Sequence, residues 1–408
     1  MSKLLSRVWS RSSSLVLGSL ALQGASFLAL LILKPRLSEV NFAFFMTQLS
    51  WASIVGSVAT FRLELLLFQE RNRVDRESLI SILVFAILML GLVGAALWAI
   101  SWQAGPAVMM SPMAILLALG FGLIEAQTFL CVQLERLGAL LVTRAVQAAA
   151  LVGTALVAWS DFGHDHLFIF YAAGVSVPVL LWWFYAIART DGRPGIHFPT
   201  LSVWKRSLSL TLSTLVNNIY ANLAILLASA TQSPGFVADF GFVMRLLTGP
   251  ITLIRQAYGH TYLVDAFRLE RDDPNPSRAL WALTKNAIGR SVATYIVIMI
   301  VAIAVLFSAN KFLQISNPQM IFLLAIVTIG QVGVNTVATI RTPLRKEKEF
   351  LIYDVLRVGV LAGALTFITA LSFDVVFSIF SSLLYAGYLL FIWWRIRAFS
   401  RSEGASSS

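Results

Sequence analysis

The chain has 408 residues, of which 58% are hydrophobic and only 12% are charged, and its mean hydropathy is +0.79. A soluble globular protein is about half apolar and about a quarter charged. The composition therefore excludes a soluble globular protein and predicts a polytopic membrane protein. The formal net charge of +11 fits the cytoplasmic loop charges of such a protein, and we expect no nucleic-acid partner.

Twelve apolar stretches are each long enough to cross a bilayer as a helix, which takes about 20 residues. Because only helices and closed barrels satisfy their backbone groups in lipid, these long apolar runs predict an all-α fold. The first stretch lacks a small-x-small cleavage motif, so we expect it to be retained as a helix. The expected spans are 13–33, 42–68, 79–100, 113–134, 139–159, 167–188, 208–230, 236–258, 287–307, 319–340, 351–371 and 375–394.

Lys and Arg are concentrated in every second connector between these spans. The alternate connectors hold only Lys34, Arg36 and Lys311. Because loops rich in Lys and Arg stay in the cytoplasm, the pattern places both termini there and predicts a multi-pass protein of the inner (plasma) membrane.

A long basic connector, 189–207, lies in the middle of the chain. It predicts an N-terminal six-helix bundle at 1–188, a cytoplasmic linker, a C-terminal bundle at 208–394 and a cytoplasmic tail at 395–408. The two halves share a weak pattern, because the second span of each follows a short turn, begins with several Phe residues and ends near an arginine. Transport sites of repeated folds lie at the interface between the repeats.

The span at 208–230 carries a polar stripe, and the first span carries a shorter one that includes Gln23. Amides are costly in lipid, so a chain retains them where they face water or a polar ligand. The stripes therefore predict a polar central cavity. The residues of the longer stripe share one helix face through spacings of three, four or seven; they are Thr211, Thr214, Asn218, Asn222 and Ser229.

Arg245 and Arg255 lie in the span at 236–258, on either side of Pro250. An arginine at the centre of a membrane helix costs about 2.5–3.5 kcal/mol on insertion scales, so it needs a polar partner or a water-filled cavity. A phosphate suits both, because the guanidinium is always charged and offers two parallel donors. Asp239 is the alternative partner for Arg245.

Three further charged residues have two interpretations each. Arg62 either faces the cavity or extends to the inner surface. Glu64 is either a titratable group on a cavity-facing stripe or part of small-residue helix packing. Glu125, near the middle of its span, either couples transport to an ion gradient or is a buried structural group bonded to Arg144 or Gln127.

No pattern indicates catalysis. The single cysteine excludes an internal disulfide, and the four histidines form no metal-binding motif. A Gly-rich phosphate loop with Lys, an acidic pair in an outer loop and a large arginine-bearing outer loop are all missing from the sequence. We therefore expect no enzyme, no catalytic residue, no metal and no cofactor.

Two stretches resemble bacterial polysaccharide flippases of the MOP superfamily. The run GFVADFGFVMRLLTGPITLIRQAYGHTYLVDAFR at 235–268 resembles the signature of their eighth helix. The run at 33–70 resembles their turn between helices 1 and 2, and its FRLELLL resembles an Arg-x-Glu at the end of helix 2. The chain departs from the pattern at Asp239-Phe240, where many members have a Tyr. An Asp close to Arg245 weakens the assignment of that arginine to a phosphate.

The resemblance implies two six-helix bundles in a V, with helices 1, 2, 7 and 8 lining a central cavity. It implies a flippase that moves undecaprenyl-diphosphate-linked oligosaccharide across the inner membrane by alternating access, driven by H+ or Na+. The partners would be this lipid-linked oligosaccharide, membrane lipids and a polysaccharide polymerase. The residues assigned by it are Arg62, Arg245 and Arg255 to the diphosphate and Asn218, Asn222, Gln23 and Gln48 to the sugars, with Glu64 and Glu125 as the candidates for ion coupling.

Two other functions compete with this one. A cation or drug antiporter of the same superfamily would need a carboxylate-lined cavity, and the arginines oppose it. A membrane enzyme of the polysaccharide pathway, such as a polymerase or ligase, is opposed by the short outer loops and the half-repeat.

Overall fold

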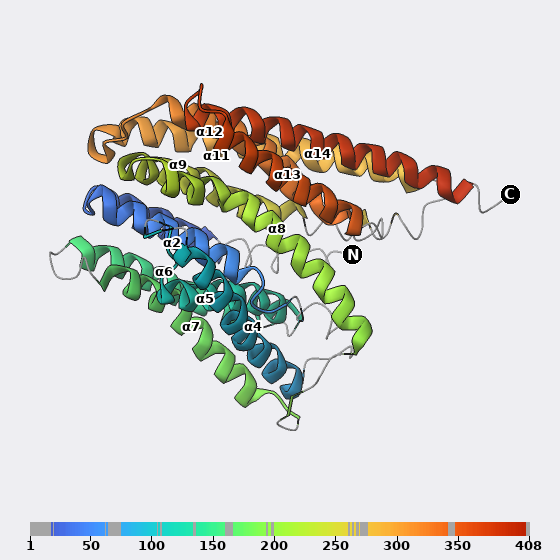
Figure 1. The fold of residues 1–408 in the computed structure, drawn as a ribbon. Coiled ribbons are helices and arrows are strands. Elements are labelled where there is room, and N and C mark those ends of the chain that lie inside the picture. Colours follow the sequence, from blue (N-terminus) through green and yellow to red (C-terminus); the bar gives the residue numbers. More distant parts are fainter. Residues whose placement is uncertain are drawn as a thin grey trace. The chain divides into compact units, whose positions relative to one another are not determined.

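The computed structural model describes residues 18, 20–61, 63, 75–103, 105–106, 108–133, 136–159, 166–192, 195–196, 200–259, 262, 265–266, 269, 276–341 and 347–404. Within these ranges every regular element is a helix, and none is a strand (Figure 1). The prediction of an all-α fold is therefore confirmed.

The chain forms two compact units, residues 1–241 and residues 242–408. Helix α9 (Pro234–Ile254) begins in the first unit and ends in the second. The other helices of the first unit are Leu20–Leu33, α2 (Glu39–Gly56), α4 (Arg76–Gln103), α5 (Pro112–Gln133), α6 (Leu137–Trp159), α7 (Leu167–Arg189) and α8 (Leu201–Thr231). The second unit continues with the π-turn η2 (Arg255–Gly259), α11 (Pro276–Leu313), α12 (Gln319–Val337), η3 (Ala338–Arg341), α13 (Glu347–Phe367) and α14 (Phe373–Gly404).

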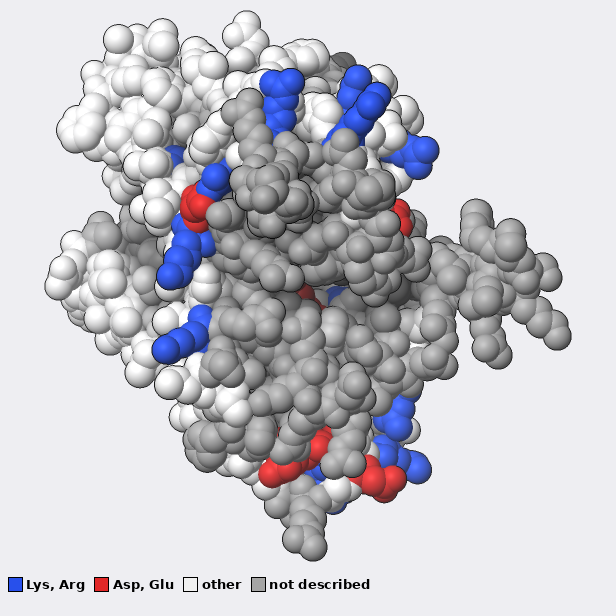
Figure 2. All heavy atoms as spheres, turned by 90° about the vertical axis from the view of Figure 1, so that its right-hand side faces the viewer, with Lys and Arg blue, Asp and Glu red and all other residues white. Residues whose placement is uncertain are grey.

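Each of the twelve expected spans overlaps one of these helices. In the described part of the chain, ten helices are long and apolar enough to cross a membrane, and Leu20–Leu33 is a shorter apolar helix. The chain is thus a multi-pass membrane protein by the length and composition of its helices. Figure 2 shows Lys and Arg beside Asp and Glu on one face of the molecule. The cytoplasmic position of the termini stays a prediction.

Helix α5 is the centre of the first unit and packs against α2, α4, α6 and α7. Small residues allow the close approach. A Cβ added at Gly122 would lie 2.3 Å from the Cβ of Ala59 and 2.9 Å from the carbonyl oxygen of Gly56. One added at Gly120 would lie 2.5 Å from Ser176 Oγ. Membrane helices associate mainly through such close backbone packing, because lipid is as apolar as the side chains it replaces.

The expectation of one continuous helix over the second span, 42–68, is wrong. Helix α2 ends at Gly56, and residues 57–61 form turns. Ser57 Oγ donates to the Ile54 carbonyl at 2.6 Å, and Phe61 has a φ of +52°, a conformation that ends a helix. Arg62 and Glu64 lie outside the described residues.

The second unit packs α12 against α11 and α14, with α13 on α14. The Arg357 side chain is buried between α13 and α14, where Nη2 donates to Asp354 Oδ1 at 2.9 Å and the guanidinium lies 4.9 Å from the centre of the Tyr388 ring. Helix α11 begins at Pro276, so its first turns replace part of the expected inner loop. Likewise α8 begins at Leu201, inside the expected linker.

Candidate functional site

A polar seam joins α2 and α8 within the first unit; it consists of Thr47, Ser53, Asn222 and Ser229. The hydroxyls of Thr47 and Ser229 are 2.7 Å apart, and Asn222 Nδ2 lies 3.4 Å from Ser53 Oγ. Two of these four residues, Asn222 and Ser229, belong to the polar stripe that the sequence predicts on α8. Hydrogen bonds of this kind hold membrane helices together, because lipid offers no alternative partner.

The hydroxyls of Thr47 and Ser229 make three hydrogen-bond contacts with only two protons between them. Thr47 Oγ1 is 2.9 Å from the Ala43 carbonyl, and Ser229 Oγ is 2.8 Å from the Ile225 carbonyl. Each hydroxyl has a single proton, so the two side chains can make only two of these three bonds at once. The contact between α2 and α8 therefore competes with the bonds inside each helix.

The other amides of the predicted stripe lie near the seam in sequence but are less buried. Asn218 is half-buried, and its Nδ2 donates to the Thr214 carbonyl at 3.0 Å. Asn222 is buried and also donates to the Asn218 carbonyl at 2.9 Å. Gln23, on the helix Leu20–Leu33, is half-buried. The structure thus brings Asn218 and Asn222 together on α8, in keeping with their shared face.

Gln48 has a different environment. It is fully buried on α2, where its Nε2 donates to the Met109 carbonyl at 2.9 Å and its Oε1 accepts from the Ser111 amide at 2.7 Å. Both ends of the amide therefore hold the backbone segment that precedes α5. A sugar contact of Gln48 stays a prediction, and it would require these bonds to break.

Gln48→Leu is expected to lower the midpoint of thermal unfolding, because the part-buried backbone groups of Met109 and Ser111 lose their partner, at up to about 1–3 kcal/mol for each unsatisfied group. Thermal unfolding in detergent, followed by the loss of the monodisperse peak, would measure it. Gln23→Leu, which removes the same amide at a half-buried position, should unfold close to the parent protein. Unchanged unfolding of Gln48→Leu together with reduced transport would favour the sugar contact.

Arg245 in α9 and Arg255 just after it lie in different surroundings. Arg245 is half-buried in the helix, and Arg255 is exposed at the first residue of the π-turn η2. Between them, Pro250 interrupts the helical hydrogen-bond pattern. The η2 turn packs on α11 and α12, and Tyr258 there shares a hydrogen bond of 3.0 Å with Thr294.

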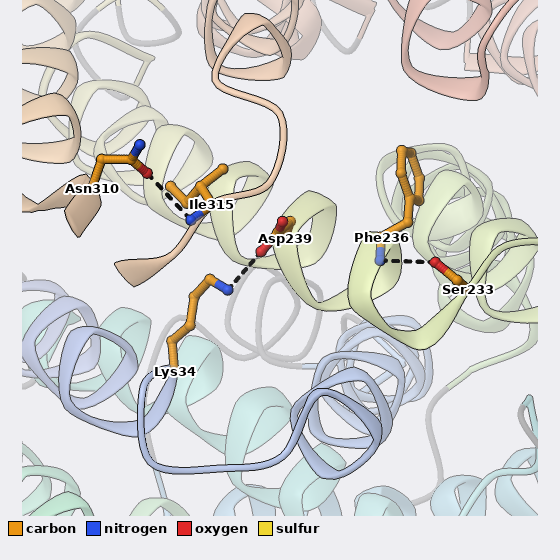
Figure 3. A network of polar contacts seen from close by, with 6 residues as sticks. All are labelled: Lys34, Ser233, Phe236, Asp239, Asn310 and Ile315. Atoms are coloured by element: carbon orange, nitrogen blue, oxygen red, sulfur yellow. Dashed lines mark hydrogen bonds and ion pairs between the residues drawn. The ribbon is translucent and has the colours of Figure 1, made fainter. Parts of the chain in front are cut away.

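Asp239, the alternative partner of Arg245 in the sequence, forms an ion pair with Lys34 (Figure 3). Lys34 Nζ lies 2.6 Å from Asp239 Oδ1, and the side chains are only 9% and 6% exposed. Sequence reasoning counted Lys34 only as one of the few basic residues in outer connectors. A lysine beside an apolar span indicates that a partner is needed. Nothing in the sequence indicated that this partner is Asp239, 205 residues further along the chain.

Glu125 is exposed on α5, so the expectation of a buried structural carboxylate is wrong. The buried Arg144 donates to Thr128 Oγ1 at 2.7 Å and lies 3.5 Å from Gln147 Oε1, and Gln147 donates to the Val175 carbonyl. Among the described residues no group of three or more His, Cys, Asp or Glu could hold a metal ion. Ion coupling through Glu125 stays a prediction.

No family model and no curated protein matches the sequence. The fold, in contrast, matches solved transporters. An inward-facing multidrug resistance MATE family transporter of the MOP superfamily is 14% identical, with a TM-score of 0.63 over 94% of this chain and 96% of that one. An outward-facing one is 13% identical, with a TM-score of 0.55 over the same shares of both chains.

A MOP superfamily transporter from Pyrococcus furiosus, described as having a binding pocket of reverse polarity, is also similar. It is 13% identical, with a TM-score of 0.56 over 94% of this chain and 96% of that one. These likenesses cover nearly the full length of both partners in each case. The chain therefore has the fold that MATE transporters of the MOP superfamily share.

Proposed function

We propose that the protein is a membrane transporter that moves an undecaprenyl-diphosphate-linked oligosaccharide across the inner membrane by alternating access. The observation that carries this proposal is the placement of Arg245, a half-buried guanidinium in a membrane helix of a transporter fold. The guanidinium is permanently charged and presents two parallel donors, an arrangement that the diphosphate of a lipid-linked sugar can accept.

The arginines are the first part of the proposed site. Arg255 stands where α9 gives way to the π-turn, and a locally altered helix is a frequent feature of functional sites. Two guanidiniums on one helix and its extension suit a diphosphate, which offers several oxygens for bidentate bonds. Arg62 is proposed to add a third positive charge. An antiporter for cations would place carboxylates there instead.

The amides are the second part. Asn218 and Asn222 face the same side of α8, and each donates to a carbonyl of its own helix. An amide side chain offers both donors and acceptors, so we propose both residues as contacts for sugar hydroxyls. Gln23 is the candidate on the helix Leu20–Leu33. Gln48 is proposed as a sugar contact only if its backbone bonds open during the cycle.

Ion coupling is the third part, with Glu125 and Glu64 as the candidate carboxylates for H+ or Na+. Glu125→Gln is expected to flatten the pH dependence of transport, because the amide can neither take up nor release a proton. Export measured over a series of external pH values would show it, with Glu77→Gln, a carboxylate in the first turn of α4, as the matched control. A pH profile identical to that of the parent protein would remove Glu125 from coupling.

A cation or drug antiporter is the second candidate, favoured by one observation: the exposed carboxylate of Glu125 on a membrane helix. The multidrug MATE transporters of the same fold make it a natural comparison. The Pyrococcus furiosus transporter, with its pocket of reverse polarity, supports the view that binding pockets of this fold differ in polarity.

A deletion strain tests the proposal against this rival. Its lipids are extracted, and the undecaprenyl-diphosphate oligosaccharides are measured together with their accessibility from each side of the membrane. Complete repeat units trapped in the inner leaflet, with no surface polymer and rescue by the intact gene, would support the flippase. Normal lipid intermediates with new sensitivity to cationic dyes would support the antiporter.

A further inference from the structure

The ion pair between Lys34 and Asp239 joins segments that are distant in sequence but lie in the same compact unit. Lys34 follows directly on the helix Leu20–Leu33, and Asp239 lies in the second turn of α9. Figure 3 shows the lysine side chain reaching across from its turn to the carboxylate on α9. The ammonium also lies 5.9 Å from the centre of the Phe42 ring.

The backbones around this pair approach closely. A Cβ added at Gly235 would lie 2.6 Å from a carboxylate oxygen of Glu39, and one added at Gly241 would lie 2.8 Å from Met46 Cγ. The helix start of α9 is thus pressed against the start of α2, and only glycine fits at these two positions without a shift. The bond between Thr47 and Ser229 lies on the same stretch of α2.

Helix α9 passes from one compact unit to the other, and Asp239 lies just before the boundary at Gly241. The later part of α9 belongs to the second unit, where Ile251 and Ile254 pack with Tyr295 and where the Tyr295 hydroxyl donates to the Leu247 carbonyl at 2.8 Å. Asp239 belongs to the part of α9 in the first unit, so its ion pair with Lys34 holds the start of this helix within that unit. Pro250, about three turns further on, gives the helix a place to bend.

A buried ion pair suits a contact that must open and close. Its attraction is strong when water is excluded and falls steeply once water enters, because the effective dielectric rises. When the pair breaks, both charges regain their hydration, which offsets part of the lost attraction. Apolar side chains that separate gain no such compensation from water. The hydrogen bond between Thr47 and Ser229 can also break at little cost. Each hydroxyl can then donate to a carbonyl of its own helix, that of Ala43 or that of Ile225.

We propose that Lys34 and Asp239 form a latch that is closed in this structure and opens once in every transport cycle. By the predicted orientation, the latch lies at the outer ends of its helices, so its opening would admit solvent from outside. Its role as a gate rests on the proposed transport function, whereas its control of outer access does not depend on which cargo is carried.

The first test locks the latch. In a Cys131→Ala background, which removes the buried native thiol, Lys34→Cys and Asp239→Cys are combined and bridged by a short reducible bis-methanethiosulfonate reagent. Bridging is expected to stop export of the surface polysaccharide, and reduction is expected to restore it. In each single-cysteine variant the reagent should leave the export rate unchanged. Undiminished transport by the bridged protein would show that the pair need not open.

The second test reads outer access without any cargo. Ser53→Cys in the Cys131→Ala background is labelled from outside intact cells with a membrane-impermeant maleimide. Asp239→Asn, which keeps the shape and removes the charge, is expected to raise the labelling rate several-fold. The charge exchange Lys34→Asp with Asp239→Lys should bring the rate back toward that of the parent.

Equal labelling rates in all three proteins would overturn the latch, whatever the deletion strain shows. A raised rate in Asp239→Asn with normal lipid intermediates in the deletion strain would instead keep the latch and remove the lipid-linked cargo. The two failures are therefore distinguishable.

Discussion

Arg245→Ala is expected to abolish export of the surface polysaccharide while the protein still inserts into the membrane in normal amount. Hydrogen bonds to a charged group contribute about 1.5–3 kcal/mol each. Loss of a bidentate pair would weaken the hold on the diphosphate on the order of 100-fold or more, because each 1.4 kcal/mol is about tenfold. Surface polymer, lipid-linked intermediates and the membrane level of the protein would be measured together.

Two variants sharpen this result. Arg245→Lys keeps the charge but loses the planar fork, so we expect partial export. Arg290→Ala removes the same side chain from an exposed position on α11 and should export normally. Normal export by Arg245→Ala would remove this residue from the site and would take the main support from the flippase proposal.

Gly122→Leu is expected to leave little folded protein. Even the first carbon of a side chain at this position would lie 2.3 Å from Ala59 Cβ and 2.9 Å from a backbone oxygen of Gly56. Overpacking a tight core typically costs about 1–3 kcal/mol and sometimes more, and here a backbone atom blocks the relaxation. Expression as a fluorescent fusion, followed by size-exclusion chromatography in detergent, would show aggregation in place of a single peak.

Gly153→Leu is the matched control for this prediction. It adds the same side chain to a glycine in the interior of a membrane helix, α6, where a Cβ meets nothing within 4 Å. Leucine also has a higher helix propensity than glycine, so the control should be as stable as the parent or slightly more stable. If the two variants behaved alike, the close contact between α5 and α2 would not exist in the protein.

The helices themselves were predictable because lipid imposes a minimum length and an apolar composition on them. The end of α2 was not, because residues 57–61 continue the apolar run while the backbone turns. Hydropathy depends only on residue types, so it cannot predict the positive φ of Phe61. The early start of α11 was missed for the opposite reason, since its first turns are polar enough to be taken as loop.

The candidate site was predictable only as a set of groups that need partners. The cost of an amide in lipid indicates that Gln48 and Asn222 must be satisfied, but it does not say by what. One bonds a neighbouring backbone segment and the other bonds a serine across the polar seam. Asp239 was assigned to Arg245 because both lie on one helix, whereas its ion-pair partner Lys34 is 205 residues away in the chain.

The polar seam also bears on how the chain is made. Its partners are separated by 182 residues for Thr47 and Ser229 and by 169 for Ser53 and Asn222. At about 5–20 residues per second of synthesis, α2 would wait roughly ten to forty seconds before α8 emerges from the ribosome. During that interval its hydroxyls have only their own helix to bond. Helix α2 therefore packs first against the helices that are synthesised soon after it. Its contact with α8 forms only after the first six helices are complete.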